Sequence, residues 1–290
     1  MSFQITTFVH GGVQAGVGSS QATPAFNAVT GNSIIVAVSL YGPEALPSVP
    51  TDTALNTYTL IGTSPTTPTV NVSQTNIWFY YSNNITGNAS NVITSSIASG
   101  TNGYWQVVAW QISGAASGNP INTFQIGGGT TGSNAQTTAA LTTTVVNTIV
   151  LAYGSTSNTG TTFTAGTGYT IEIANSDDGG LSGCEYQQFT SIQTGIVPAI
   201  TCSDSTHKWQ MMAVAVAAPS VSNNYSVPDC RNYGNFPNTA VTTNGTKLYT
   251  GQTSSNVAIP PTDSRAAGAP TASGTYPQNS RAPGVNGPNN

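Results

Sequence analysis

Residues 33–41 read SIIVAVSLY, a run of β-branched and small apolar side chains that contains no charge. Ile34, Val36 and Val38 alternate with a second apolar set between them. A period of two places successive side chains on opposite faces of a strand. Because both sets are largely apolar, this stretch predicts a strand in a sheet with a packed face, as in a β-sandwich.

Stretches of the same kind recur along the first 218 residues, and turns rich in Gly and Asn separate them. The predicted strands are residues 3–10, 33–41, 57–61, 76–82, 91–98, 103–112, 135–144, 147–154, 168–174, 183–190, 197–202 and 208–218. Turn clusters are expected at 30–32, 87–88 and 127–129. This pattern indicates an all-β fold, an antiparallel two-sheet jelly-roll sandwich over residues 1–218.

Charge is scarce in this chain. Only 5% of its 290 residues are charged, against about 25% in a typical globular protein. Lys208 is the first basic side chain, so the residues before it carry acidic charge alone. Binding to nucleic acid or to an anionic membrane needs several Lys or Arg on one face, so neither partner is expected. The edges of the sandwich also lack the Lys that usually blunts them, which predicts that an assembly covers them.

Residues 219–290 have a different composition. They hold nine of the 17 prolines and few large apolar side chains, which predicts an extended arm rather than a domain. Three units of Pro, a short spacer, Asp or Asn, then Arg recur in it. The residues expected to act in assembly are Asp229, Arg231, Asp263, Arg265, Asn279 and Arg281. Such an arm can clamp neighbouring copies by adding strands to their sheet edges, and the alternative is a flexible linker.

Three segments, GNSIIVAV at 31–38, NIWFYY at 76–81 and FTAGTGYT at 163–170, resemble the jelly-roll, lectin-like domains of bacteriophage virion proteins. The arm is similar to the repetitive Pro-x-x-Ser-Arg tails of some phage structural proteins, at 264–265 and 280–281. The resemblance implies a non-enzymatic virion protein, in the capsid, neck or tail, that is assembled in the host cytoplasm and contacts copies of itself and other virion proteins. No Sec-type leader follows Met1, which agrees with that route.

Few residues suggest chemistry, and no catalytic residue or cofactor is expected. Asp204 and His207 lie close in sequence, which favours a polar turn over a triad. Glu172 and Glu185 are a possible carboxylate pair, but solvent-facing positions are expected for both. Asp177 and Asp178 form a weak candidate site for a structural Ca²⁺ ion, with an ordinary turn as the alternative.

Aromatic side chains leave a second function open. Trp78, Tyr80 and Trp105 are candidate contacts for a glycan, which would make the chain a glycan-binding adhesin. Trp105 and Trp110 are separated by an odd number of residues, so they face opposite sides of one strand and one of them is expected in the core. A bacterial surface filament subunit, exported to the cell surface, is a further alternative.

Two of the cysteines lie symmetrically about a turn signal at 193–195. A hairpin that turned there would place Cys184 opposite Cys202, which permits a cross-strand disulfide. The alternative is that both remain buried thiols, because a register shift of one residue separates them.

Overall fold

The computed structural model describes residues 2–11, 14–17, 20–41, 47–62, 76–96, 102–129, 134–156, 158, 160–173, 182–219, 240–243 and 246–249. The chain divides into two compact units, Met1–Ser220 and Val221–Asn290. In the second unit, β20 (Ala240–Thr243) pairs antiparallel with β21 (Thr246–Tyr249). Every element in the described part of the chain is a strand, and these residues contain no helix long and apolar enough to cross a membrane.

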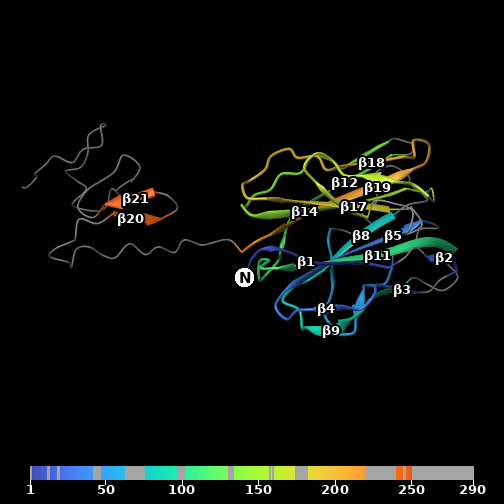
Figure 1. The fold of residues 1–290 in the computed structure, drawn as a ribbon, viewed down its shortest axis with the longest axis horizontal. Coiled ribbons are helices and arrows are strands. Elements are labelled where there is room, and N and C mark those ends of the chain that lie inside the picture. Colours follow the sequence, from blue (N-terminus) through green and yellow to red (C-terminus); the bar gives the residue numbers. More distant parts are fainter. Residues whose placement is uncertain are drawn as a thin grey trace, which may run out of the picture. The chain divides into compact units, whose positions relative to one another are not determined.

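The first half of unit one contains a large antiparallel sheet, a small three-stranded sheet and a separate pair of strands (Figure 1). The large sheet runs in the order β1 (Gln4–His10), β11 (Asn102–Ser113), β5 (Ser33–Tyr41), β8 (Asn76–Ser82) and β7 (Thr59–Leu60), with β2 (Gln14–Val17) also on β11. The small sheet runs β3 (Ser20–Ala22), β10 (Ile93–Ser96), β6 (Thr51–Asp52), and β4 (Phe26–Ala28) pairs with β9 (Asn88–Asn91).

The second half repeats this strand order. Its large sheet runs β12 (Ile121–Gly129), β19 (Trp209–Ala217), β14 (Thr148–Thr156), β17 (Ser182–Phe189) and β16 (Thr170–Ile173). Its small sheet runs β13 (Ala135–Thr137), β18 (Ala199–Cys202), β15 (Phe163–Thr164). Strand by strand, β12 takes the place of β1, β19 that of β11, β14 that of β5, β17 that of β8 and β16 that of β7. The all-β, antiparallel prediction is therefore confirmed, but two sandwiches stand where one was expected.

Sequence similarity follows the same correspondence. Residues 51–59 and 162–170 share Thr-x-Thr-Ala-x-x-x-Tyr-Thr, and residues 105–109 and 209–213 share Trp-Gln-x-x-Ala. Sheet register agrees, since Gln106 lies opposite Ser39 in the first half and Gln210 lies opposite Ser155 in the second. The body of the protein is thus an internal repeat of one sandwich.

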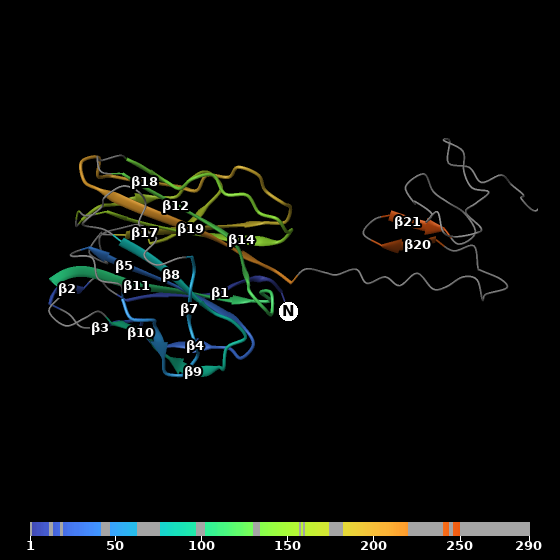
Figure 2. The same ribbon diagram turned by 180° about the vertical axis from the view of Figure 1, so that it is seen from behind.

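Three apolar clusters hold the layers together. The central cluster lies between the two large sheets and draws on both halves, for example through Phe79 and Trp110 from the first and Leu151 and Val214 from the second. Each half also has its own cluster between its large and small sheets. Figure 2 shows the large sheets lying next to one another, with the small sheets on the outer sides. Both faces of each large sheet are therefore buried, which explains the runs of apolar residues in β5, β14 and β19.

The expected turn at residues 127–129 is wrong, because these glycines belong to β12. A Cβ atom built on Gly127 would lie 1.8 Å from the carbonyl oxygen of Thr137, where the chain passes close by on its way to the small sheet. Gly11, at the corresponding crossing in the first half, has the carbonyl oxygen of Ala22 at 2.5 Å from such an atom. Close backbone approach requires glycine at both positions, rather than turn formation.

Candidate functional site

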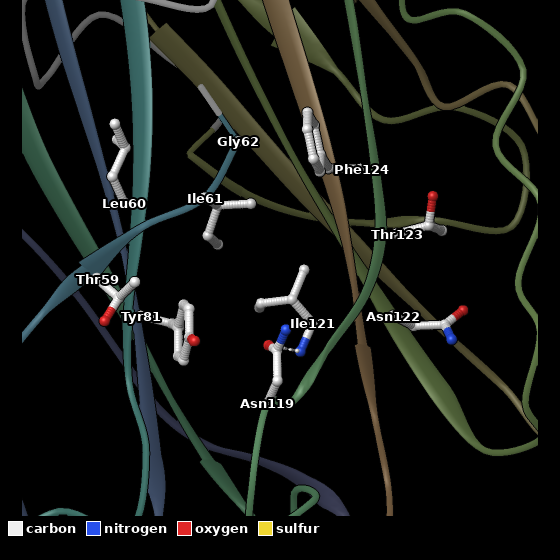
Figure 3. Close-up of a pocket in the computed structure, with 10 residues that line it drawn as sticks. All are labelled: Thr59, Leu60, Ile61, Gly62, Tyr81, Asn119, Ile121, Asn122, Thr123 and Phe124. Atoms are coloured by element: carbon white, nitrogen blue, oxygen red, sulfur yellow. Dashed lines mark hydrogen bonds between the residues drawn. The ribbon is translucent and has the colours of Figure 1, made fainter. Parts of the chain in front are cut away.

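A cleft opens between the two halves of unit one, with a volume of about 510 Å³. One wall comes from β7, the residues that follow it and Tyr81 of β8, and the other comes from Asn119 and the start of β12 (Figure 3). Its lining residues are Thr59, Leu60, Ile61, Gly62, Tyr81, Asn119, Ile121, Asn122, Thr123 and Phe124. The volume falls in the range typical of small-molecule sites, about 300–1,000 Å³.

The wall that contains Asn119 is fixed by hydrogen bonds around the start of β12. The Asn119 side-chain oxygen accepts from the Ile121 N–H at 2.9 Å, and the Pro120 carbonyl accepts from the Ala217 N–H at 2.8 Å. Asn122 is held from outside the cleft, since its amide group donates to the Thr144 hydroxyl at 2.7 Å. This wall is thereby attached to the last strand of the body.

The lining of the cleft is uncharged and combines polar with apolar side chains. Ile61 belongs to the central cluster, and the half-buried Tyr81, Ile121 and Phe124 pack against that cluster. Figure 3 shows the side chains of Ile61, Ile121 and Phe124 between the two walls. None of the lining residues carries a formal charge. A phosphate or carboxylate ligand would find no compensating cation among them, so the cleft suits a neutral ligand.

A polar cluster fixes the halves against one another within the same interface. The Tyr153 hydroxyl lies 2.9 Å from the Ser39 hydroxyl and donates to the Gln106 side-chain oxygen at 3.0 Å. Ser39 also lies 3.2 Å from the Ser182 hydroxyl. Residues of both halves take part, and all four are buried. Satisfied buried polar groups specify one packing geometry, so the walls of the cleft have a defined spacing.

Glu172 is half-buried at the interface between the two halves. The expectation that its side chain faces solvent is therefore wrong. Its carboxylate accepts a hydrogen bond from the indole N–H of Trp110, which belongs to the other half. Burial raises the pKa of Glu172 to about 7, although the bond from Trp110 acts in the opposite direction. A carboxyl group that titrates near neutrality here makes the interface sensitive to pH.

Glu185 is fully buried, so the expectation of solvent exposure is wrong for it too. It accepts the Gly166 N–H at 2.6 Å. Burial raises the pKa of Glu185 to about 7, against the lowering effect of the backbone N–H groups of Gly166 and Ala199. Glu185 bonds on the small-sheet side, whereas Glu172 faces the interface. The two carboxylates lie on opposite sides of the sheet and do not form a glycosidase pair.

Asp204 and His207 form a polar turn. The Asp204 carboxylate accepts from the Thr206 N–H and hydroxyl, each at 2.9 Å, and lies 2.9 Å from Nδ1 of His207. It also accepts from the Thr156 hydroxyl at 3.2 Å. Burial acts to raise the pKa of Asp204, but the bonds from Thr206 and His207 outweigh it and hold the pKa at about 2. These contacts position the turn before β19.

The aromatic side chains expected to contact a glycan lie in the core of the first half. Trp78 is 3% exposed, and Tyr80 and Trp105 are each 1% exposed. Rings buried to this degree offer no face to a sugar in solvent. Trp105 and Trp110 do face opposite sides of β11, but both are buried, because each face of the large sheet packs against another sheet.

The cysteines are not opposed across a hairpin. Cys184 lies on β17, which pairs with β14 and β16, whereas Cys202 lies on β18, which pairs with β13 and β15. Cys184 faces the central cluster and Cys202 faces the cluster of the second half. Both thiols are buried, and no disulfide joins them.

Several predicted sites lie outside the described residues. These are the Ca²⁺ candidates Asp177 and Asp178 and the arm residues Asp229, Arg231, Asp263, Arg265, Asn279 and Arg281. Among the residues that are described, no group of three His, Cys, Asp or Glu side chains is placed to hold a metal ion.

Comparisons with known proteins give no assignment. No protein-family model matches the chain, and neither a curated protein nor a solved structure matches it. The predicted strands did not include β12, and β12 supplies four of the residues that line the cleft. The cleft was therefore not predicted from the sequence. The two shared motifs, Thr-x-Thr-Ala and Trp-Gln-x-x-Ala, are the signal that would have revealed the repeat and hence an interface between its halves.

Proposed function

We propose that this chain is a non-enzymatic structural protein of a virion, in the capsid, neck or tail, that assembles through its sheet edges and through a C-terminal arm that clamps neighbouring copies. The strand order supports this proposal. In each half the first strand lies beside the last, β1 on β11 and β12 on β19. In each small sheet, likewise, an early strand lies beside a late one. This nesting supports the jelly-roll part of the proposal, and jelly rolls are used in viral capsid and lectin domains.

The single observation that carries the proposal is the outer strand β1. It has seven residues, ends the large sheet on one side, and contains no Lys, Arg, Asp, Glu or Pro. A long edge strand presents unpaired backbone N–H and C=O groups and normally carries charge or proline that prevents association. An edge left without these features is suited to continue its sheet into another subunit.

The arm supports the proposal through its sequence. The nine prolines of residues 219–290 favour an extended path, and the repeated Asp or Asn followed by Arg supplies groups that can pair with a neighbouring subunit. An extended segment can bind by laying a strand on an open edge.

Two changes to the full chain test the proposal. Deletion of residues 221–290 and, separately, Thr6→Lys on the exposed face of β1 are each expected to shift the size distribution toward monomer in light scattering and electron microscopy. Leu55→Lys adds the same charge on an exposed turn and should leave assembly unchanged. A wild-type chain that stays monomeric at every concentration would refute the assembly role. Immunogold labelling of particles released by lysis tests the virion assignment, and unlabelled particles would count against it.

A further inference from the structure

The cleft lies at a corner of the interface, where the outer strand β12 of one large sheet meets the edge strand β7 of the other. Because the chain is an internal repeat, β1 and β16 form an equivalent corner. Register places Phe8 opposite Trp110 and Phe124 opposite Val214. Phe124 therefore corresponds to Phe8, and Val214 corresponds to Trp110.

Three further residues of the cleft have counterparts. Ile121 pairs with Val216 as Ile5 pairs with Ile112, so Ile121 corresponds to Ile5. Tyr81 corresponds to Tyr186, and Ile61 to Glu172 through the Thr-x-Thr-Ala repeat.

The chain itself fills the other corner. The Trp110 indole is fully buried, with its ring centroid 5.5 Å from that of Phe8 and 6.0 Å from that of Phe79, the latter nearly parallel. Its N–H donates to Glu172. One aromatic ring thus occupies the space between the outer strand of one large sheet and the edge strand of the other.

At the cleft, other residues take the positions of Trp110 and Glu172. The smaller Val214 takes the position of Trp110, and the apolar Ile61 takes the position of Glu172. Phe124 is retained, and it remains half-buried beside an open volume of about 510 Å³. By the correspondence of the two halves, the cleft lies at the corner equivalent to the one that the first half fills with its own indole. Of the two rings that flank Trp110, Phe8 has its counterpart in Phe124, whereas Phe79 corresponds by register to Cys184.

We propose that this cleft binds a neutral aromatic ring of about indole size, carried by a small molecule or by a peptide side chain. Phe124 and Tyr81 supply aromatic contacts, Ile61 and Ile121 supply apolar contacts, and the uncharged lining favours a neutral ligand. This inference does not depend on the role in a virion, because it concerns the interface between the two halves of one chain.

Saturation-transfer NMR on the full chain, with indole and N-acetyltryptophanamide as probes, tests the proposal. Saturable indole binding is expected, and Phe124→Ala should weaken it at least fivefold. Phe8→Ala, the same change at the filled corner, should leave it unchanged. Val214→Trp, which supplies the missing ring, should abolish binding while the near-ultraviolet circular dichroism stays native.

The outcomes separate the possible sources of the ring. Binding of both probes indicates a peptide side chain, whereas binding of indole alone indicates a small molecule. Absence of saturable binding to the wild-type chain, or binding unchanged by Phe124→Ala, would overturn the proposal. Binding of a neutral disaccharide in place of indole would overturn it as well. If Val214→Trp does not fold, the comparison of Phe124→Ala with Phe8→Ala still decides.

Discussion

The indole N–H of Trp110, on β11 of the first half, donates a hydrogen bond to the carboxylate of Glu172, on β16 of the second half. Both groups lie in the packed interface between the large sheets. The bond joins the halves at one corner of the interface. It has no counterpart at the cleft, where Val214 and Ile61 take the places of Trp110 and Glu172. The interface therefore combines one polar, filled corner with one apolar, open corner.

Glu172→Gln is expected to stabilise the protein at alkaline pH. An acid whose pKa is raised from 4.5 to about 7 on folding binds its proton more tightly in the folded state. The free energy of unfolding therefore falls as pH rises from about 4.5 to about 7. The neutral amide avoids this loss, so the variant should gain on the order of 2 kcal/mol at pH 8 and little at pH 4. Urea unfolding at both pH values measures the difference.

Trp110→Phe provides the matched control for this pH effect. It removes the donor to Glu172, so it should destabilise the protein more at pH 8, where the carboxylate is charged, than at pH 4. Equal losses at both pH values would show that the indole contributes packing alone. A Glu172→Gln variant with an unchanged pH profile would show that another group is responsible for it.

Gly127→Ala is expected to destabilise the protein by on the order of 2 kcal/mol, because the added methyl group meets the backbone carbonyl of Thr137. Gly118→Ala is the control, since a Cβ there has no neighbouring atom within 4 Å. Differential scanning calorimetry should show a lower melting temperature for the first variant only. Equal melting temperatures would mean that the crossing from β12 to β13 is looser than the structure indicates.

Asp52→Ala should cost the first half on the order of 3 kcal/mol. The Asp52 carboxylate accepts from the Tyr58 hydroxyl at 2.9 Å, from the Asn91 side-chain amide at 3.1 Å, and from the backbone and side-chain N–H groups of Asn56 at 2.8 and 2.9 Å. Its loss leaves buried donors without an acceptor. Chemical unfolding measures the change, and Asp52→Asn, which keeps one acceptor oxygen, should lose less. Equal losses for both variants would contradict the hydrogen-bonding role.

Cys184 and Cys202 should react with a thiol reagent only after unfolding, because both are buried in different apolar clusters. Titration in native buffer and in urea, under non-reducing conditions, measures this directly. Formation of a bond between them in the folded protein would require β17 and β18 to rearrange until the two thiols meet. That result would contradict the sheet order.

Local sequence was sufficient for several strands. The predicted strands at 33–41 and 76–82 coincide with β5 and β8, because their alternation and β-branched content act within the strand itself. Strand β12 was missed because the residues 127–129 resemble a turn. Gly127 has to be glycine because of its contact with Thr137, which is close in space only after folding.

The site was harder to predict than the fold. Trp105 and Trp110 are an odd number of residues apart, which predicts that they lie on opposite faces of one strand. The structure confirms this prediction. Whether either ring reaches solvent depends on what covers each face, and a second sandwich covers the inner one. That packing also explains why Glu172 is half-buried, whereas Glu185 is buried on the other face of its sheet, toward the small sheet.

The amino-acid sequence by itself determined that the body is built of antiparallel strands and that it carries almost no charge, since backbone preference and side-chain alternation are local properties. Tertiary structure decided that two repeated sandwiches share a core, that Trp110 meets Glu172 across it, and that a cleft remains beside Phe124. The physical reason is that burial depends on the neighbour packed against a face. That neighbour comes from residues roughly a hundred positions away.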